Sequence, residues 1–283
     1  MRLAIASGKG GTGKTTLAVN LAIKAKEKQS CLLVDLDVEE PNGGIFVQGD
    51  LVAEHEARRA IPDWDAAACT LCGKCPSWCL YNALIKLGDT ILVMPNLCHS
   101  CYACSEMCPA SALAMKPDSL GTITHRRFEG LDFVESRLEI GLEQASPLIS
   151  QSLAYIDEHL EKHDLQILDS PPGTACAMVS AVKQADFVIL ISEPTPFGLH
   201  DLKLAVQTVR ELGIPFGAVI NRDGIGNDEI YGYLKEEKIP LLAKIPHQRR
   251  IAELYSQGAM LYKEIAEIDE ALEDILSYIG RLR

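Results

Sequence analysis

The sequence contains no apolar run of the roughly 20 residues that a transmembrane helix requires. It also lacks an opening charged and apolar leader that ends at a small-residue cleavage site. Positive charge is scarce, since 27 Lys and Arg residues stand against 39 Asp and Glu residues and leave a net charge of −12. Nucleic-acid binding depends largely on clustered Lys and Arg. We therefore expect a cytoplasmic protein that binds neither a membrane nor nucleic acid.

Cysteine, in contrast, is abundant. The 283 residues include 10 cysteines, and eight of them fall in the runs "CTLCGKCPSWC" and "CHSCYACSEMC". Disulfide scaffolds of this density belong to small secreted domains, whereas this chain is long enough to bury a full core and shows no export signal. Metal ligation is the better interpretation of these thiols.

A phosphate-binding motif lies near the start of the chain. The apolar stretch "RLAIAS" leads into "GKGGTGKTT" and then into a helical pattern, which is the context that G-x-x-x-x-G-K-[ST] requires. The glycines let backbone N–H groups converge on phosphate oxygens at a helix N-terminus. Lys14 is expected to neutralise the β and γ phosphates of ATP, and the Thr15 hydroxyl to reach Mg²⁺. The predicted nucleotide-binding residues of this loop are Gly8, Gly10, Gly11, Thr12, Gly13, Lys14, Thr15 and Thr16.

An additional lysine at position 9 makes the loop similar to the deviant P-loop of the family that includes MinD, ParA, the nitrogenase iron protein and the Mrp-type iron–sulfur carriers. In that family the added lysine crosses a dimer interface to the partner's nucleotide. The resemblance therefore implies that ATP binding closes a dimer with a second copy or a paralogous ATPase. Within a single chain, we expect Lys9 to be a solvated loop lysine.

Two strand-like stretches end in carboxylates that match this family. In "CLLVDLD", the resemblance implies that Asp35 supports the Mg²⁺ shell and that Asp37 positions the attacking water at the start of the first switch segment. In "LQILDSPPGT", it assigns Asp169 to a Mg²⁺-bound water and the Gly173 N–H to the γ-phosphate. Carboxylates at strand ends can also be simple helix caps. The predicted catalytic residues are Lys9, Lys14 and Asp37, the Mg²⁺ residues are Thr15, Asp35 and Asp169, and the base-binding residues are Asn221, Arg222 and Pro246.

Strand and helix patterns alternate through the rest of the chain. Such alternation predicts βαβ crossovers and a three-layer α/β fold with a mostly parallel sheet. The last helical stretch has an acidic polar face, whereas MinD-type membrane anchors are basic, so we expect it to pack on the sheet. Strands are expected near 187–191, 216–221 and 239–244, and helices near 199–212, 228–237 and 264–279.

The alternation stops from about Asp63 to Lys116. Both cysteine runs there follow C-x-x-C-x-x-C-x-x-x-C and resemble bacterial two-cluster ferredoxins, in which the fourth cysteine of each run ligates the other cluster. Zinc ribbons instead place two C-x-x-C pairs about 15 to 20 residues apart. One departure is Leu80, which stands where the ferredoxin pattern has proline. The resemblance implies two [4Fe–4S] clusters, one on Cys69, Cys72, Cys75 and Cys108 and the other on Cys98, Cys101, Cys104 and Cys79.

The predicted organisation is an ATPase split into 1–62 and 119–283, with a ferredoxin-like α+β domain inserted at 63–118. Because the insertion follows the first switch segment, a movement of that switch has a short path to the clusters. Cys31 and Cys176 lie outside both runs, and we expect both to be small buried side chains.

Three functions remain open. The first is an ATPase that couples dimer closure to electron transfer through the two clusters to a redox partner. The second is an iron–sulfur or metal-cofactor assembly factor that serves a cluster-accepting protein. The third is a MinD-like positioning ATPase with structural or redox-sensing clusters. The ferredoxin spacing favours the first, and the absence of the C-x-x-C that Mrp-type carriers place near their C-terminus counts against cluster donation.

Overall fold

A nine-stranded sheet forms the centre of this computed structural model, which describes residues 1–282. From one edge to the other its strands are β11 (Leu241–Pro246), β10 (Phe216–Asp223), β9 (Phe187–Ser192), β1 (Arg2–Ala6), β8 (Leu165–Asp169), β2 (Cys31–Asp35), β7 (Leu131–Leu138), β6 (Leu113–Phe128) and β3 (Asp50–Trp64). All neighbours from β11 to β7 are parallel, whereas β6 pairs antiparallel with β7 and with β3. The prediction of a mostly parallel sheet is confirmed. Residue 283, the last of the predicted ATPase segment, lies outside the described residues.

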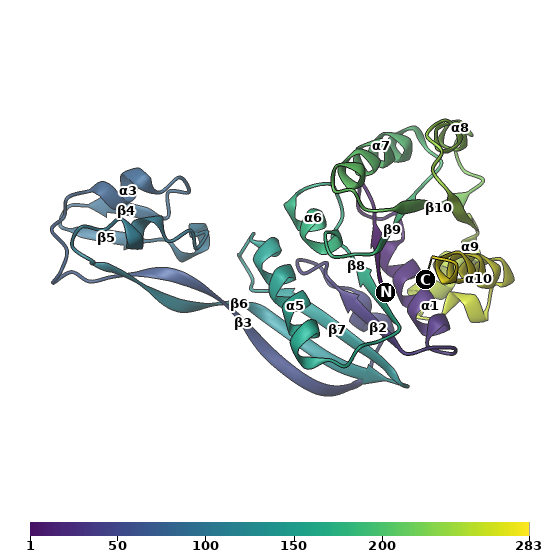
Figure 1. The fold of residues 1–283 in the computed structure, drawn as a ribbon, viewed down its shortest axis with the longest axis horizontal. Helices are drawn as coiled ribbons and strands as arrows, with labels where there is room; N and C mark the ends of the chain where they lie inside the picture. Colours follow the sequence, from purple (N-terminus) through teal and green to yellow (C-terminus); the bar gives the residue numbers. More distant parts are fainter. Residues whose placement is uncertain (283) are drawn as a thin grey trace.

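Helices cover both faces of this sheet, which confirms the three-layer α/β fold (Figure 1). Side chains of a strand point alternately to the two faces, so Leu3 and Ile5 of β1 join one core while Ala4 and Ala6 join the other. The first face carries α1 (Lys14–Ala25), α9 (Arg249–Ser256), the 3₁₀ turn η2 (Leu261–Lys263) and α10 (Ala266–Gly280), and the second carries α5 (Ala145–His159), α6 (Cys176–Val182), α7 (Pro196–Glu211) and α8 (Glu229–Glu236).

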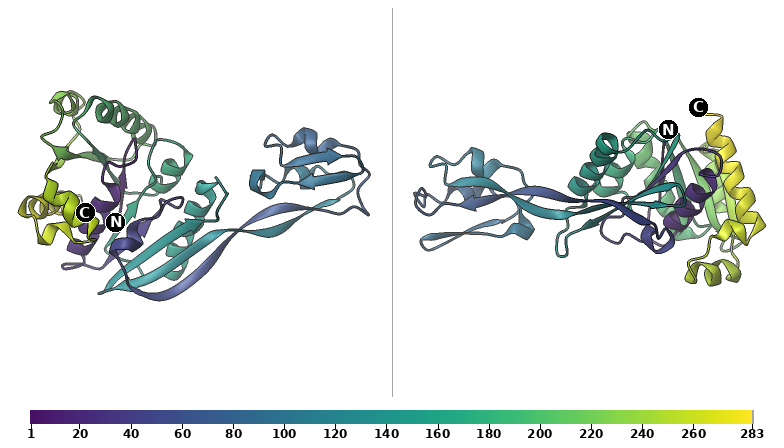
Figure 2. Two further views of the ribbon diagram at one scale, coloured as in Figure 1. Left: turned by 180° about the vertical axis from the view of Figure 1, so that it is seen from behind. Right: turned by 90° about the horizontal axis from the view of Figure 1, so that it is seen from below.

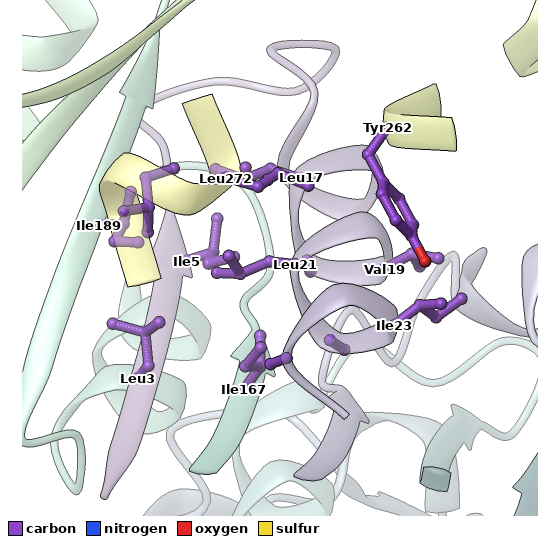
Figure 3. Packing of buried hydrophobic residues seen from close by; sticks show 14 of the residues in the cluster. Leu3, Ile5, Leu17, Val19, Leu21, Ile23, Ile167, Ile189, Tyr262 and Leu272 are labelled. Atoms are coloured by element: carbon purple, nitrogen blue, oxygen red, sulfur yellow. The ribbon is translucent and has the colours of Figure 1, made fainter. Parts of the chain in front are cut away.

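The core under α1 and α10 is built from aliphatic side chains (Figure 3). Leu17 and Leu21 of α1 and Leu272 of α10 are each at most 2% exposed, and they lie in one cluster with Ile5. Burying each such side chain stabilises the fold by about 1.5–3 kcal/mol. The last helix therefore packs on the sheet, as predicted. Among the described helices, none has the length and apolar character needed to cross a membrane.

The antiparallel edge of the sheet continues into a long two-stranded ribbon. β3 and β6 stay paired from Asp50 opposite Arg127 to Trp64 opposite Leu113, but β7 accompanies β6 only over 121–128. Beyond that point the ribbon leaves the sheet (Figures 1 and 2). Both predicted domain boundaries, at 62/63 and at 118/119, thus fall inside continuous strands.

Residues 65–112, here called the cysteine module, lie at the far end of this ribbon (Figure 2). The sequence predicted no strand and helix alternation in this segment. The structure adds two short strands, which pair antiparallel with each other. A tight turn at Gly88, with φ of 59°, joins them. The elements of the module are α3 (Lys74–Trp78), β4 (Leu84–Leu87), β5 (Thr90–Val93), the 3₁₀ turn η1 (Pro95–Leu97) and α4 (Ala103–Glu106).

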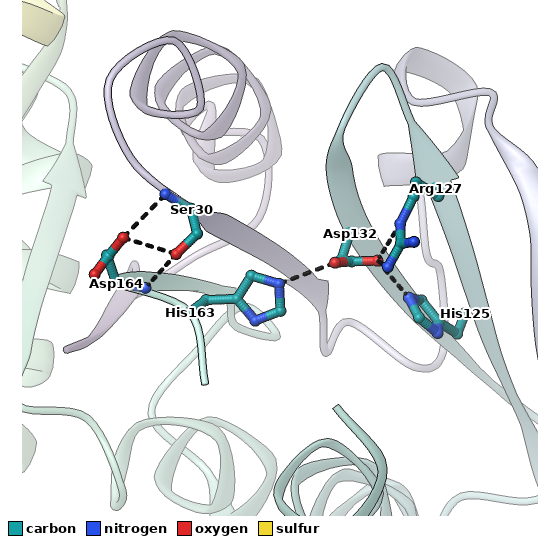
Figure 4. A network of polar contacts seen from close by, with 6 residues as sticks. All are labelled: Ser30, His125, Arg127, Asp132, His163 and Asp164. Carbon is teal, nitrogen blue, oxygen red and sulfur yellow. Dashed lines mark hydrogen bonds and ion pairs between the residues drawn. The ribbon is translucent and has the colours of Figure 1, made fainter. Parts of the chain in front are cut away.

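A buried polar network joins the antiparallel edge to the parallel sheet (Figure 4). Asp132 of β7 contacts Nε2 of His125 at 2.8 Å and Nε2 of His163 at 2.9 Å, and it accepts a hydrogen bond from Nε of Arg127 at 3.0 Å. Burial alone would raise the pKa of Asp132, but the hydrogen bonds from His163, His125 and Arg127 outweigh it and hold this pKa below its ordinary value. The ionised carboxylate is therefore part of the fold.

Candidate functional site

The loop between β1 and α1 places the phosphate-binding motif at the carboxyl end of the central parallel strands, where ligands bind in open α/β sheets. Two of its positions require glycine. Gly13 caps α1 with φ of 98°, and a Cβ there would lie 2.5 Å from the side-chain nitrogen of Asn221. A Cβ on Gly8 would lie 2.2 Å from the carbonyl oxygen of Asp201 on α7. The loop is therefore held close to its neighbours while the N-terminus of α1 faces a cavity that can take a phosphate.

Two buried carboxylates lie under this loop, beside the buried amine of Lys14. Asp35 accepts backbone N–H groups from Gly43 at 2.8 Å and from Asn42 at 3.0 Å, at the start of the short helix α2 (Gly43–Phe46). Burial raises the pKa of Asp35 to about 7, against the opposing hydrogen bonds from the backbone N–H groups of Gly43 and Asp37. Burial and the Asp35 charge raise the pKa of Asp169 well above its ordinary value; Thr15 approaches and opposes this shift without completing a hydrogen bond.

Lys14 and Asp37 complete this charged group. Burial lowers the pKa of the Lys14 amine, and the charges of Asp169, Asp37 and Asp35 oppose that shift. Burial likewise raises the pKa of Asp37 to about 6, and Lys14 is the main opposing charge. One lysine thus faces three carboxylates, of which two are 1% exposed. A divalent cation would compensate the excess negative charge, so these residues fit a Mg²⁺–nucleotide site.

A cavity of about 540 Å³ opens beside these residues, which is within the usual size range of a ligand site. Its remaining walls come from α9, α10 and the turn after β11. Of the predicted residues, it is lined by Gly10, Gly11, Gly13, Lys14, Thr15, Thr16, Asp37, Asn221, Arg222 and Pro246. The cavity is also lined by Asn20, Glu40, Asn42, Gln248, Ile251 and Tyr255, which were not among the predicted site residues.

Three predicted nucleotide residues, Gly8, Thr12 and Gly173, are not among those that line this cavity. The Thr12 carbonyl instead accepts a hydrogen bond of 2.7 Å from the Asn221 amide, which braces the loop. Gly173, with φ of 92°, donates its N–H to the Ser7 carbonyl at 3.0 Å. A contact between this N–H and a γ-phosphate would require the bond to Ser7 to open.

Lys9 is not the solvated loop lysine expected of a single chain. Its Nζ lies 3.3 Å from Oε2 of Glu193, and Nη1 of Arg222 lies 2.7 Å from the other oxygen of the same carboxylate. Glu193 follows β9 at the edge that carries the P-loop and is only 5% exposed. A buried carboxylate needs a cationic partner, and Lys9 together with Arg222 supplies it.

The eight cysteines of the two runs line two separate cavities in the cysteine module. The fourth cysteine of each run lies with the first three of the other, since Cys108 lines the first cavity and Cys79 the second. The first thiol set is Cys69, Cys72, Cys75 and Cys108, and the second thiol set is Cys79, Cys98, Cys101 and Cys104.

The thiols within each set repel one another as thiolates. Burial raises the pKa of Cys75, and the neighbouring Cys108, Cys69 and Cys72 raise it further. Burial also raises the pKa of Cys104 to about 11, with Cys98, Cys101 and Cys79 adding to the shift. No group of three or more His, Cys, Asp or Glu side chains in residues 1–282 is arranged to hold a single metal ion.

The two cysteines outside the runs differ in exposure. Cys31 is 1% exposed in the core, as predicted. Cys176 is exposed, so the prediction of a small buried side chain was wrong. Its position at the first residue of α6 explains the difference, because the buried side of this helix is formed by Met178, Ala181 and Val182.

The sequence profile of the CobQ/CobB/MinD/ParA nucleotide binding domain matches residues 3–261. The chain therefore belongs to this family and is a P-loop ATPase.

Related chains span almost the whole length of this one. An uncharacterised protein of Methanocaldococcus jannaschii is 32% identical over 99% of this chain and 97% of its own. A protein of Pyrococcus furiosus named an iron–sulfur cluster carrier is 24% identical over 100% of this chain and 86% of its own.

The fold is similar to solved MinD structures. The cell division ATPase MinD of Pyrococcus furiosus superposes with a TM-score of 0.61 at 20% identity, covering 100% of this chain and 99% of that one. MinD of Pyrococcus horikoshii, complexed with Mg-ADP, also gives 0.61, at 19% identity and over 99% and 96% of the two chains. At these identities the likeness concerns the fold alone.

Proposed function

On the basis of this family membership, we propose that the chain is a MinD-like ATPase that closes a dimer on ATP and carries two redox-active [4Fe–4S] clusters. The ATPase domain comprises 1–62 and 119–283, and the ferredoxin-like domain 63–118 is inserted between them. The observation that supports the second half of this proposal is the sorting of eight thiols into two sets of four, with the fourth cysteines exchanged between the runs.

In the ATPase domain, Lys14 binds the β and γ phosphates, and Thr15, Asp35 and Asp169 hold Mg²⁺ with its bound water. Asp37 orients the attacking water toward the γ-phosphate. The buried carboxylates Asp35 and Asp169 support this assignment. Without a cation beside it, a buried carboxylate either stays protonated or, when ionised, destabilises the fold. The partner is a second copy or a paralogue, whose nucleotide Lys9 reaches after leaving Glu193.

In the cysteine module, the first thiol set holds one cluster and the second thiol set holds the other. Bound [4Fe–4S] clusters supply one-electron redox chemistry. Two runs of C-x-x-C-x-x-C-x-x-x-C resemble two-cluster ferredoxins, whereas zinc ribbons place two C-x-x-C pairs about 15 to 20 residues apart. Backbone N–H groups already donate hydrogen bonds to the sulfurs of Cys69, Cys79 and Cys108. The bond from the Leu71 N–H to Cys69, for example, is 3.4 Å long. Such donors stabilise thiolate ligands.

Electron transfer is the second candidate, and one observation favours it. Cys72 of the first set and Cys101 of the second are both exposed at the module surface, so electrons would have a short path from each cluster to a docked redox protein.

The test begins with anaerobic purification and measurement of iron and sulfide. We expect about eight of each per chain, four for each cluster. ATP hydrolysis is then compared between oxidised and dithionite-reduced protein: redox sensing predicts different rates, whereas electron transfer predicts ATP-dependent reoxidation of the reduced clusters by an added acceptor. A colourless preparation with fewer than about four irons per chain, less than one cluster, would reject the cluster assignment. The ATPase assignment would then stand alone.

A further inference from the structure

A single buried arginine connects the ATPase domain, the ribbon and the cysteine module. The side chain of Arg59, on β3, is 4% exposed. Its Nη2 lies 2.9 Å from a carboxylate oxygen of Asp118 on β6. Its Nη1 donates to the side-chain oxygen of Gln144 at 3.0 Å and to the backbone carbonyl of Cys98 at 3.4 Å. A buried guanidinium with partners on three segments fixes their relative positions.

Gln144 lies at the end of a short path from the nucleotide site. The first switch continues past Asp37 to Val38, whose carbonyl accepts the N–H of Leu138 at the end of β7 at 2.8 Å. The next residue, Glu139, donates its N–H to the Leu120 carbonyl of β6 at 3.0 Å. The chain then runs through 140–143 to Gln144, which caps α5. From Val38 to Gln144, each step is a backbone hydrogen bond or a covalent connection. The last two steps are the hydrogen bonds that Arg59 donates to Gln144 and to the Cys98 carbonyl.

The path ends at one thiol set and not at the other. The loop that carries Cys98 is also joined to β3 by Ser100, whose hydroxyl donates to the Ala60 carbonyl at 2.7 Å. Pro62 and Met115 of the ribbon line the second cavity. The ribbon also touches the first set, but through apolar packing at its tip, where Leu113 lines the first cavity and Trp64 packs against the cluster that contains Cys75. The 69–75 loop itself is braced by a hydrogen bond from within the module, in which Nζ of Lys86 donates to the Leu71 carbonyl at 2.5 Å. The second thiol set is therefore the one that a movement of the ATPase domain reaches first.

We propose that Arg59 is the positioning residue through which the nucleotide state of the first switch reaches the second thiol set, while the first set stays unaffected. This inference rests on the proposed function only in supposing that the second set is a cluster site. A chain of ion pairs and hydrogen bonds shows coupling only if the nucleotide site and the second thiol set respond to the same change. The test therefore measures both regions in the same molecule.

Hydrogen exchange followed by mass spectrometry measures this response on the full chain, prepared anaerobically, with Mg²⁺ and either ADP or a non-hydrolysable ATP analogue. Amides of 98–104 should exchange at rates that differ at least about fivefold between the two nucleotides, the lower end of ordinary coupling free energies. Amides of 69–75 should not change. In Arg59→Gln the difference at 98–104 should disappear, and Arg59→Lys should lose it as well because an ammonium cannot bridge three partners in one plane.

The neighbouring arginine provides a matched control. Arg58 carries the same charge, but its side chain is 61% exposed and pairs with Glu56, so Arg58→Gln should keep the full nucleotide response. Should Arg59→Gln fail to fold, Gln144→Ala removes one hydrogen bond and keeps the pair between Arg59 and Asp118; it should at least halve the response.

Three results would overturn the inference: no nucleotide effect at 98–104 while the P-loop amides of 8–16 respond, an equal effect at 69–75, or a wild-type response in Arg59→Gln. Iron measured on the same samples separates the two proposals. An iron-poor chain that keeps the nucleotide response at 98–104 rejects the clusters and supports the role of Arg59. An iron-loaded chain that lacks this response supports the clusters and rejects the role of Arg59.

Discussion

Removing the Glu193 charge should strengthen ATP-dependent dimer formation. In the isolated chain this carboxylate holds the Lys9 amine at 3.3 Å, and the proposed dimer needs that amine at the partner's nucleotide. The Lys9 side chain is 33% exposed and Arg222 competes for the same carboxylate, so the pair is worth about 1 kcal/mol, nearer to an exposed ion pair than to a buried one. A symmetric dimer breaks it twice. Glu193→Gln should therefore make the free energy of dimer formation more favourable by about 2 kcal/mol, which lowers the dissociation constant about 30-fold.

Analytical ultracentrifugation with Mg²⁺ and a non-hydrolysable ATP analogue measures this constant. Glu237→Gln is the matched control, because it removes the same charge from a surface pair with Arg210 and lies before the start of β11, whereas Glu193 follows the end of β9. It should leave the constant within about twofold of wild type, a difference of about 0.4 kcal/mol. A Glu193→Gln dimer no tighter than wild type would refute the idea that Glu193 restrains Lys9. If Glu193→Gln tightens the dimer equally in the absence of nucleotide, the gain comes from reduced charge repulsion and not from the release of Lys9.

Two further predictions concern the nucleotide site and the cysteine module, and a third concerns the buried network around Asp132. Lys14→Ala should lower ATP hydrolysis at least about 100-fold, since it removes the phosphate counter-charge; unchanged phosphate release would reject the P-loop assignment. Cys108→Ala should halve the iron content by emptying one site, with Cys176→Ala as a control that keeps it, and iron loss in both variants would contradict the two-set arrangement. Asp132→Asn should lower the free energy of unfolding at neutral pH by about 3 kcal/mol, because it leaves buried partners unpaired. Because the folded pKa of Asp132 lies below its ordinary value of 3.8, its stabilisation is present above that value and is lost as the pH falls through the folded pKa. Urea denaturation from neutral pH down to about pH 3 should show this loss in the wild type but not in the variant.

Local patterns made the ATPase half of the fold predictable. A glycine-rich turn between an apolar strand and a helix places its residues by short-range geometry, and the strand ends at Asp35 and Asp169 then follow from the shared carboxyl edge of a parallel sheet. The helix and strand ranges after residue 187 agree with the structure within a few residues for the same reason. No such pattern marked β7, because "LDFVESRL" mixes apolar and charged residues, and its first four residues, Asp132 included, are all buried.

Pairings between distant segments could not be predicted. Glu193 meets Lys9 only because β9 lies next to β1 in the sheet, and the sequence between them gives no sign of this contact. The exposure of Cys176 depends on which side of α6 the sheet occupies, and a helix of 7 residues has too few positions to set that side by pattern. The cysteine sets were predicted as sets through resemblance to ferredoxins, but their distance from the ATPase domain was not.

That distance has a mechanical consequence. β3 and β6 run without interruption from the sheet to the cysteine module, with register shifts only between Leu51 and Ala53 and between Ala57 and Arg58. A paired ribbon transmits rotation better than a flexible linker, which would let the module reorient freely. The second of those irregularities lies directly before Arg59, where the ribbon leaves β7. A bulge is the usual place for an antiparallel pair to bend, so a movement of the first switch would tilt the module about this point, and the arginine side chain would set how far.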